Sequence, residues 1–246
     1  MPQADTRNNQ TPEQPVDDID ARITSIAALG EPIRRALYRY VVAQDDPVSR
    51  DQAATGVGVP RHVAKFHLDK LEDDGLLDVQ FSRPPGRSGP GAGRPSKLYR
   101  RSTRELAVSL PERRYDFAGD IMATAMSRSK QDRVPIADAL RDAAMAAGRE
   151  LGIEGRRRAG PKPTQDRLVG IAREVLAENG YEPRNNDGGM ILANCPFHAL
   201  AQDHTEVVCG MNLDLLTGLL EGLEVTQLRS ELDPAPNRCC VTVCHQ

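Results

Sequence analysis

The sequence predicts an α+β fold in which a unit of helices and a hairpin, a helical connector and a small α/β unit follow one another. Three observations support it. Apolar residues recur at helical spacing from about Ile19, two short strand-like segments flank a Gly- and Pro-rich stretch, and all five cysteines lie after residue 194. We therefore divide the chain into a disordered tail (1–18), the helix-and-hairpin unit (19–104), a helical connector (105–163) and a cysteine-bearing unit (164–246).

The composition is ordinary for a globular protein, with 39% hydrophobic and 27% charged residues. The chain has no apolar run of the length that spans a membrane, and its polar N-terminal segment lacks the apolar stretch of a signal peptide. We therefore expect a cytoplasmic protein without membrane contact. Because the net charge is −3, a nucleic-acid surface would have to come from local segregation of charge.

Helix-start and helix-stop residues define the elements of the first unit. Pro32 fits the first turn of a helix, Ser49 with Gln52 forms a capping box, and Gly75 is a typical residue after a helix C-terminus. A Gly- and Pro-containing turn precedes Arg61. The predicted elements are helices over 19–43 (interrupted at 30–32), 50–55 and 61–74, and strands over 76–81 and 96–101.

This order of helices, short turn and hairpin is that of a winged helix-turn-helix domain. One face of the helix over 61–74 is apolar, and the opposite face is free to enter a major groove of DNA. From Ser82 to Arg104 there are seven basic and no acidic residues, a local charge pattern typical of phosphate binding. The residues assigned to DNA binding are Arg61, His62, Lys65, Phe66, Asp69, Arg83, Arg87, Arg94, Lys97 and Arg100. The alternatives are a solvated linker for the basic loop and packing at a domain interface for Phe66.

Two segments carry a resemblance in this unit. Residues 68–77, LDKLEDDGLL, and 93–99, GRPSKLY, resemble the ArsR/DeoR-type winged helix-turn-helix regulators, and the resemblance covers about residues 20–102. It implies a transcription regulator that binds a double-stranded DNA operator. Such proteins commonly bind as homodimers that read two half-sites, and the connector is the expected dimer surface.

The second half of the chain has mixed periodicity. A basic, Pro-containing linker is expected over 156–163, and a helix starting at Thr164 or Gln165 should run to Asn179, where Gly180 follows. The other predicted elements are helices over 111–129, 136–150, 197–204 and 211–222 and strands over 190–193, 225–232 and 240–244.

Four of the five cysteines are candidate metal ligands. Thirteen residues separate Cys195 from Cys209 and twenty-nine separate Cys209 from Cys239, which matches neither a zinc finger nor a ferredoxin. Cys195 is expected between a strand and a helix, and Cys209 just before a helix, where the helix dipole favours the thiolate that soft metals bind. Cys239 and Cys240 are expected to open a strand, where adjacent side chains point to opposite faces. We therefore expect one of them to be a ligand and the other a packed thiol, with Cys244 uninvolved.

The context of these cysteines carries a second resemblance. Residues 194–201, NCPFHALA, with His204, Cys209 and 239–241, CCV, look like the sensor domain of the SufR-like iron–sulfur regulators. The resemblance implies a repressor of iron–sulfur assembly genes, with a cluster held by Cys195, Cys209, either Cys239 or Cys240, and a fourth ligand. The doubled cysteine departs from the family pattern, and His198 and His204 could ligate zinc or the fourth iron.

Several alternatives stay open. The thiols could bind zinc, could be inert and buried, or could lie beside a site for a small organic effector, and the Cys195–Pro196 dipeptide weakly resembles a haem-regulatory motif. A metal-dependent enzyme is disfavoured, because the sequence has no nucleophile–base pair, no phosphate-binding glycine loop and no HExxH. The sequence does not define the operator or the sign of regulation.

Overall fold

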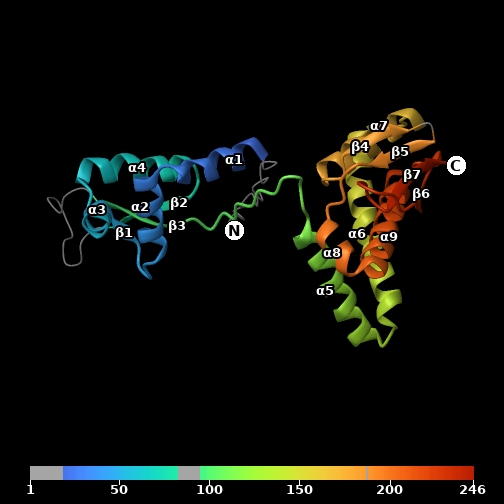
Figure 1. Cartoon of the computed structure of the whole chain (residues 1–246), viewed down its shortest axis with the longest axis horizontal. Coiled ribbons are helices and arrows are strands. Elements are labelled where there is room, and N and C mark those ends of the chain that lie inside the picture. The colour runs from blue at the N-terminus through green and yellow to red at the C-terminus, as the bar shows by residue number, and fades with distance from the viewer. Residues whose placement is uncertain (1–18, 83–94, 187) are drawn as a thin grey trace, which may run out of the picture. The chain divides into compact units, whose positions relative to one another are not determined.

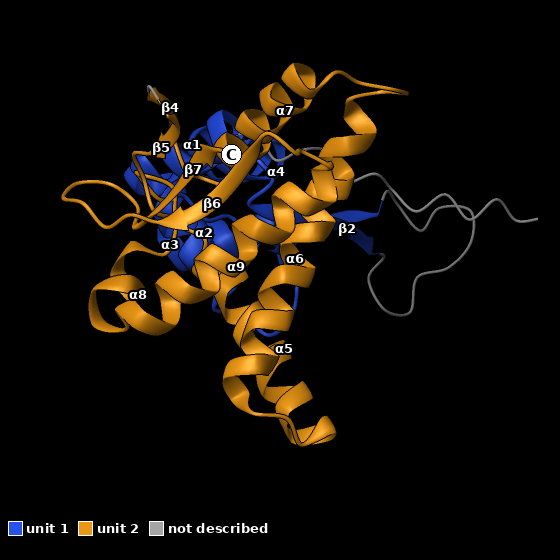
Figure 2. Cartoon of the chain, turned by 90° about the vertical axis from the view of Figure 1, so that its right-hand side faces the viewer, with its two compact units in different colours: residues 1–108 blue, residues 109–246 orange. Residues whose placement is uncertain are grey.

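The structure is a computed structural model that describes residues 19–82, 95–186 and 188–246, so the expected disordered tail, 1–18, lies outside it. The chain forms two compact units, 1–108 and 109–246 (Figure 2). Helices and strands occur in both, which confirms the mixed helix-and-strand class. Among the described helices, none is both long and apolar enough to cross a membrane.

In the described residues of the first unit, 19–82 and 95–108, the chain forms four α-helices, a short 3-10 turn and a small antiparallel sheet (Figure 1). The three strands lie in the order β1-β3-β2, and Tyr99 of β3 is in register with Val48 on one side and Val79 on the other. Its elements are α1 (Ile19–Ala27), η1 (Ala28–Gly30), α2 (Pro32–Val42), β1 (Val48–Ser49), α3 (Arg50–Val57), α4 (Arg61–Asp73), β2 (Leu77–Ser82) and β3 (Ser96–Arg101).

Local chemistry explains these boundaries. The Glu31 carboxylate accepts hydrogen bonds from two backbone N–H groups of the first turn of α2, and the Ser49–Gln52 capping box opens α3. Gly58 and Gly75 end α3 and α4 with φ of +73° and +71°, a left-handed conformation that glycine adopts without strain. The apolar faces meet in a core that includes Leu37, Ala64, Leu68, Leu71 and Tyr99.

The second unit packs five helices against and beside a four-stranded antiparallel sheet of order β4-β5-β7-β6. Its elements are α5 (Tyr115–Asp132), α6 (Ile136–Arg158), α7 (Gln165–Glu178), β4 (Pro183–Asn186), β5 (Gly189–Leu192), α8 (His198–Asp203), α9 (Thr205–Leu223), β6 (Leu228–Leu232) and β7 (Val241–His245). The expected connector helices α5 and α6 share one hydrophobic core with α7, α9 and the sheet. The connector is therefore part of the same compact unit as the cysteine-bearing segment.

Glycines bring α6 and α9 together along their lengths (Figures 1 and 2). A Cβ built on Gly148 would lie 2.8 Å from the backbone nitrogen of Leu219, and one built on Gly152 would lie 2.8 Å from the Cα of Gly222. On α9, Gly218 and Gly222 face the α6 backbone in the same way. Because only hydrogen occupies these positions, the two backbones approach more closely than any side chain would allow.

Two sequence-based boundaries are corrected, and two strands are added. Helix α9 begins at Thr205 rather than at residue 211, so Cys209 lies inside it. Helix α6 continues to Arg158 through the start of the expected linker, because Arg156 and Arg158 form ion pairs with Glu224 and Glu178 that hold its last turn. The two-residue strand β1 and the strand β4 were not anticipated from the sequence.

Candidate nucleic-acid interface and thiol site

The outer face of α4 is positioned as the periodicity predicts. Ala64, His67, Leu68 and Leu71 are buried against the rest of the first unit. Arg61, His62, Lys65 and Phe66 are exposed on the other side of the helix, and the Phe66 ring is 64% exposed. A large aromatic residue exposed beside cations is available to contact a base or a sugar.

A cationic cleft lies at the start of this helix. Its volume is about 300 Å³, and it is lined by Arg50, Arg61, His62 and Lys65. Arg61 forms an ion pair with Asp51, and Lys65 Nζ lies 4.0 Å from Asp69. Both pairs include an exposed cation, so they are weak and leave the cleft able to accept an anionic phosphate oxygen.

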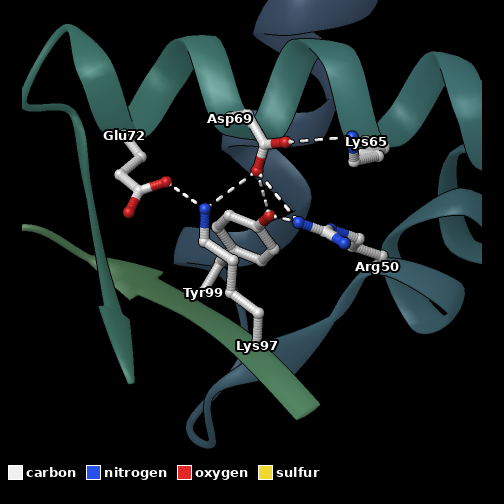
Figure 3. A network of polar contacts seen from close by, with 6 residues as sticks. All are labelled: Arg50, Lys65, Asp69, Glu72, Lys97 and Tyr99. Atoms are coloured by element: carbon white, nitrogen blue, oxygen red, sulfur yellow. Dashed lines mark hydrogen bonds and ion pairs between the residues drawn. The ribbon is translucent and has the colours of Figure 1, made fainter. Parts of the chain in front are cut away.

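Asp69 is the centre of a polar network that joins α4 to β3 (Figure 3). Its Oδ1 accepts hydrogen bonds from Tyr99 Oη at 2.6 Å and from Lys97 Nζ at 2.9 Å. Arg50 Nη2, at the start of α3, donates to the same oxygen at 3.2 Å, and Lys97 also binds Glu72. The Asp69 carboxylate on α4 is therefore hydrogen-bonded to both α3 and β3.

The charges of this network reinforce one another. Partial burial alone would raise the pKa of the Asp69 carboxyl, but the hydrogen bonds from Tyr99 and Lys97 and the charge of Arg50 lower it. Partial burial alone would lower the pKa of the Lys97 ammonium group, but the contacts of this group with Glu72 and Asp69 raise its pKa above the usual value. Both groups stay ionised near neutral pH as an internal pair.

The remaining residues assigned to DNA binding differ in their surroundings. Asp69 and Lys97 bind one another within the unit, whereas Arg100 is 54% exposed and lies 3.9 Å from Asp78. Arg83, Arg87 and Arg94 lie outside the described residues. Contact of any of these residues with DNA stays a prediction.

In the second unit, four cysteines from three segments form what we call the thiol site: Cys195, Cys209, Cys239 and Cys240. Cys195 follows β5, Cys209 lies in α9, and the other two precede β7. Cys209 Sγ lies 2.8 Å from Cys240 Sγ, and Cys195 and Cys239 interact closely enough for each thiol to shift the pKa of the other. Electrostatic interaction between Cys195 and Cys209, and between Cys239 and Cys240, links the two pairs.

The doubled cysteine lies before the strand that it was expected to open, and which of the two thiols would be a metal ligand stays a prediction. Strand β7 begins at Val241, so Cys239 and Cys240 lie just before it, but their backbone hydrogen bonds still point to opposite neighbours. The backbone N–H of Cys239 donates to Leu192 O at 2.8 Å, and the carbonyl of Cys240 accepts from Asp233 N at 2.7 Å. Each side chain therefore meets its own partner thiol. Cys244 contacts Thr242 and Glu231 instead.

The thiol site has an uneven distribution of charge. The hydrogen bond from Cys239, the backbone N–H of Phe197 and the charge of Arg113 lower the pKa of Cys195 to about 7 against the effect of burial. The hydrogen bond to Cys195 and burial raise the pKa of Cys239, and burial and Cys240 raise the pKa of Cys209 to about 12. Cys195 is therefore the thiol most readily ionised among these three.

Two polar residues under the site were missed by the sequence reasoning. Asn212 of α9 donates from Nδ2 to Cys239 Sγ at 3.2 Å, and its Oδ1 accepts from the Tyr181 hydroxyl. Both side chains are almost fully buried, and buried polar groups are normally there to satisfy a partner. The detectable signal was an asparagine on the apolar face of α9 formed by Val208, Met211 and Leu215.

The loop that carries Cys195 is also fastened to the segment before α5. Asn194 Nδ2 donates to Glu112 O at 3.0 Å and to Gly180 O at 2.6 Å. Arg113 donates to Asn194 Oδ1 and to the carbonyl of Cys195 at 3.3 Å, and the N–H of Arg114 donates to Pro196 O at 3.1 Å. Residues 112–114 follow closely after the end of the first unit in the sequence.

The chemistry of the donors suits a soft metal, because thiolates from separate elements are the ligands of zinc and of iron–sulfur clusters. Their spacing is pairwise, and the described parts of the chain contain no group of three or more His, Cys, Asp or Glu side chains placed to hold a metal ion. His198 and His204 are exposed, and His198 Nε2 lies 3.3 Å from Gln202 Nε2.

Comparison with known proteins bears on the first unit. A family model described as a helix-turn-helix domain matches residues 29–80, from the 3-10 turn η1 into strand β2. No curated protein and no solved structure matches the chain. The match supports a DNA-binding transcription regulator with a helix-turn-helix domain of the ArsR type, as the sequence predicts.

Proposed function

We propose that the chain is a homodimeric transcriptional repressor that binds operator DNA with a winged helix and responds to an iron–sulfur cluster on the thiol site. The observation that carries the sensing part is that cysteines from three segments of the second unit meet in two pairs, Cys209 with Cys240 and Cys195 with Cys239. Buried inert thiols need no such convergence, since a free cysteine packs like any small apolar residue.

In this proposal α4 enters the major groove with Arg61, His62, Lys65 and Phe66 toward DNA, and the cationic cleft binds a backbone phosphate. The hairpin β2–β3 is the wing. The Asp69 network supports this assignment, because it holds Lys97 and Tyr99 of β3 against α4. Recognition helix and wing then reach the DNA as one piece, which reduces the ordering cost of binding.

The thiol site supplies the ligands of the proposed cluster, and its low-pKa member, Cys195, is a thiolate near neutral pH. When bound, a cluster supplies a redox- and oxygen-sensitive centre whose presence or loss changes the packing of its ligands. The route to the DNA-binding unit runs through Asn194 and the Cys195 carbonyl, which hold residues 112–114.

Dimerisation is proposed through the α5–α6 hairpin. Met126 of α5 and Ile136 of α6 are 66% and 52% exposed, with Val134 between the helices also exposed. Large apolar side chains gathered at a hairpin suit burial against a second copy. Two copies would read two half-sites of a palindromic operator.

The decisive experiment is purification without oxygen, followed by a visible spectrum and quantification of iron, acid-labile sulfide and zinc per chain. A brown protein with iron and sulfide is expected, and Cys195→Ser should be colourless while the control Cys244→Ser stays brown. About one zinc per chain would replace the cluster by a zinc site. A colourless protein that takes up no metal on reconstitution would refute the sensing proposal and leave DNA binding standing.

DNA binding is tested separately. Operator fragments selected from random duplexes should bind the cluster-loaded and the metal-free chain with different affinities. Equal affinities would refute the coupling between the thiol site and DNA, because a ligand shifts an equilibrium only by its different affinity for the two states.

A further inference from the structure

We infer that Cys209 and Cys240 form a reversible disulfide when the metal-free chain meets a peroxide, which makes the thiol site a second, cluster-independent redox sensor. The inference stands on the pairing of the thiols and does not require the proposed cluster. Its effect on DNA binding does rest on the proposed function.

The geometry places these two sulfur atoms for bond formation. Their separation is 2.8 Å, so they need to move only about 0.8 Å closer to reach the length of a disulfide bond. Cys209 is held in place by helix α9. Cys240 is held in place by the hydrogen bond that its carbonyl accepts from the backbone N–H of Asp233. The pair therefore needs a local side-chain adjustment and no change of fold.

Exposure determines which thiol meets the oxidant. Cys209, Cys195 and Cys239 are buried, whereas Cys240 is partly exposed. Within the thiol site peroxide therefore arrives first at Cys240, and Cys209 is the sulfur in contact with it that can resolve the product. The two sulfur atoms are in direct contact, so a sulfenic acid formed on Cys240 has the Cys209 thiol beside it.

The chemistry balances with one peroxide. The Cys240 sulfur takes one oxygen from hydrogen peroxide to form a sulfenic acid, and water leaves. The Cys209 sulfur then attacks the Cys240 sulfur: the S–S bond forms, the S–O bond breaks, and the hydroxyl leaves with the Cys209 proton as a second water. The two thiols lose two electrons, the peroxide gains two, and a dithiol reductant reverses the change.

The disulfide and the bound cluster exclude one another, because both use Cys209 and Cys240. A disulfide removes Cys209 and Cys240 as thiolate ligands, because metals and clusters bind the deprotonated thiol. The oxidised chain should therefore not accept a cluster until it is reduced. The cross-link also ties α9 to the segment before β7, which are the two elements that carry Asn212 and Cys239.

The test uses the full metal-free chain treated with hydrogen peroxide. Free thiols should fall from five to three and return after reduction. Cleavage at acidic residues separates Cys195 from Cys209, because Asp203 and Glu206 lie between them, and tandem mass spectrometry should then find the Cys209 peptide joined to the Cys240 peptide. Cys244→Ser should keep this cross-link, and Cys240→Ser should lose it, as should Cys209→Ser.

The outcomes are separable from those of the proposed function. A full count of free thiols after peroxide, a sulfinic acid at Cys240, or a cross-link between other cysteines in the wild type would each overturn the inference, even if the anaerobic protein holds a cluster. A Cys209–Cys240 cross-link in a chain that never takes up iron would support the inference and leave the cluster proposal refuted. An oxidised chain that accepts a cluster without prior reduction would overturn the claim that the two states exclude one another.

Discussion

Replacing Gly152 by alanine should loosen the second unit by separating α6 from α9. The new Cβ would lie 2.8 Å from the Cα of Gly222 and 2.8 Å from the Leu223 nitrogen, whereas carbon atoms pack at about 3.5–4.0 Å. Helix α9 must therefore retreat by at least about 0.7 Å, since the Leu219 carbonyl oxygen lies closer still to the new Cβ, and its backbone cannot rotate away as a side chain would. Overpacking of this kind costs about 3 kcal/mol, and the better helix propensity of alanine returns about 1 kcal/mol.

The net loss of about 2 kcal/mol is best measured by hydrogen exchange with mass spectrometry on peptides of α9, because it reports this unit alone. Exchange that occurs through opening of α9 should accelerate about thirtyfold. Gly170→Ala is the matched control, since a Cβ there meets nothing within 4 Å and should stabilise α7 by up to about 1 kcal/mol. An exchange rate within twofold of the wild type in Gly152→Ala would refute the close-packing argument.

Three further predictions concern the two candidate sites. Asp69→Asn should destabilise the first unit by about 2 kcal/mol in urea unfolding, because three charge-assisted hydrogen bonds to Oδ1 lose their anionic acceptor. The control is Asp73→Asn, at an exposed position of the same helix, which should change the free energy of unfolding by less than about 0.5 kcal/mol. Equal effects of the two substitutions would contradict the network. Lys65→Met should reduce by about 1 the slope of log affinity against log salt concentration for a mixed-sequence DNA duplex. Lys97→Met should leave that slope unchanged, because the Lys97 ammonium is held by Asp69 and Glu72. An equal reduction of the slope in Lys97→Met would show that Lys97 binds phosphate. In the metal-free chain the thiolate absorbance of Cys195 should appear around pH 7, and Cys239→Ala should move it to higher pH because the variant removes the hydrogen bond that lowers this pKa. Because the pKa is lowered on folding, the contribution of this thiolate to stability is present above the usual thiol pKa and is lost as the pH falls through 7. An unchanged titration in Cys239→Ala would contradict the pairing.

Much of the first unit could be predicted because its signals are local. The Ser49–Gln52 capping box, Gly75 and the two strands of the hairpin each depend on neighbours a few residues away. The face of α4 that points outward followed from helical periodicity alone. The partners of Asp69 and Lys97 could not be predicted in this way, because they depend on how β3 lies against α4.

The second unit was less predictable because its determinants are distant in sequence. Helix α6 is extended by ion pairs to residues 20 and 68 positions away. Helix α9 starts at Thr205 with no side-chain cap to mark it, so Cys209 was placed outside the helix. The four candidate cysteines were identified from residue type and context, but which thiol meets which depends on where β7 begins.

The strand order of the second unit also determines when the thiol site can form during synthesis. Strand β7 follows β6 in the chain, yet it occupies the inner position between β5 and β6, and the segment just before it supplies Cys239 and Cys240. The nascent chain must therefore emerge from the ribosome through His245 before the sheet can close. Until then Cys195 and Cys209 lack their partner thiols, so loading or oxidation of the site requires synthesis past Cys240, and a product that terminates before Cys239 would present neither pair.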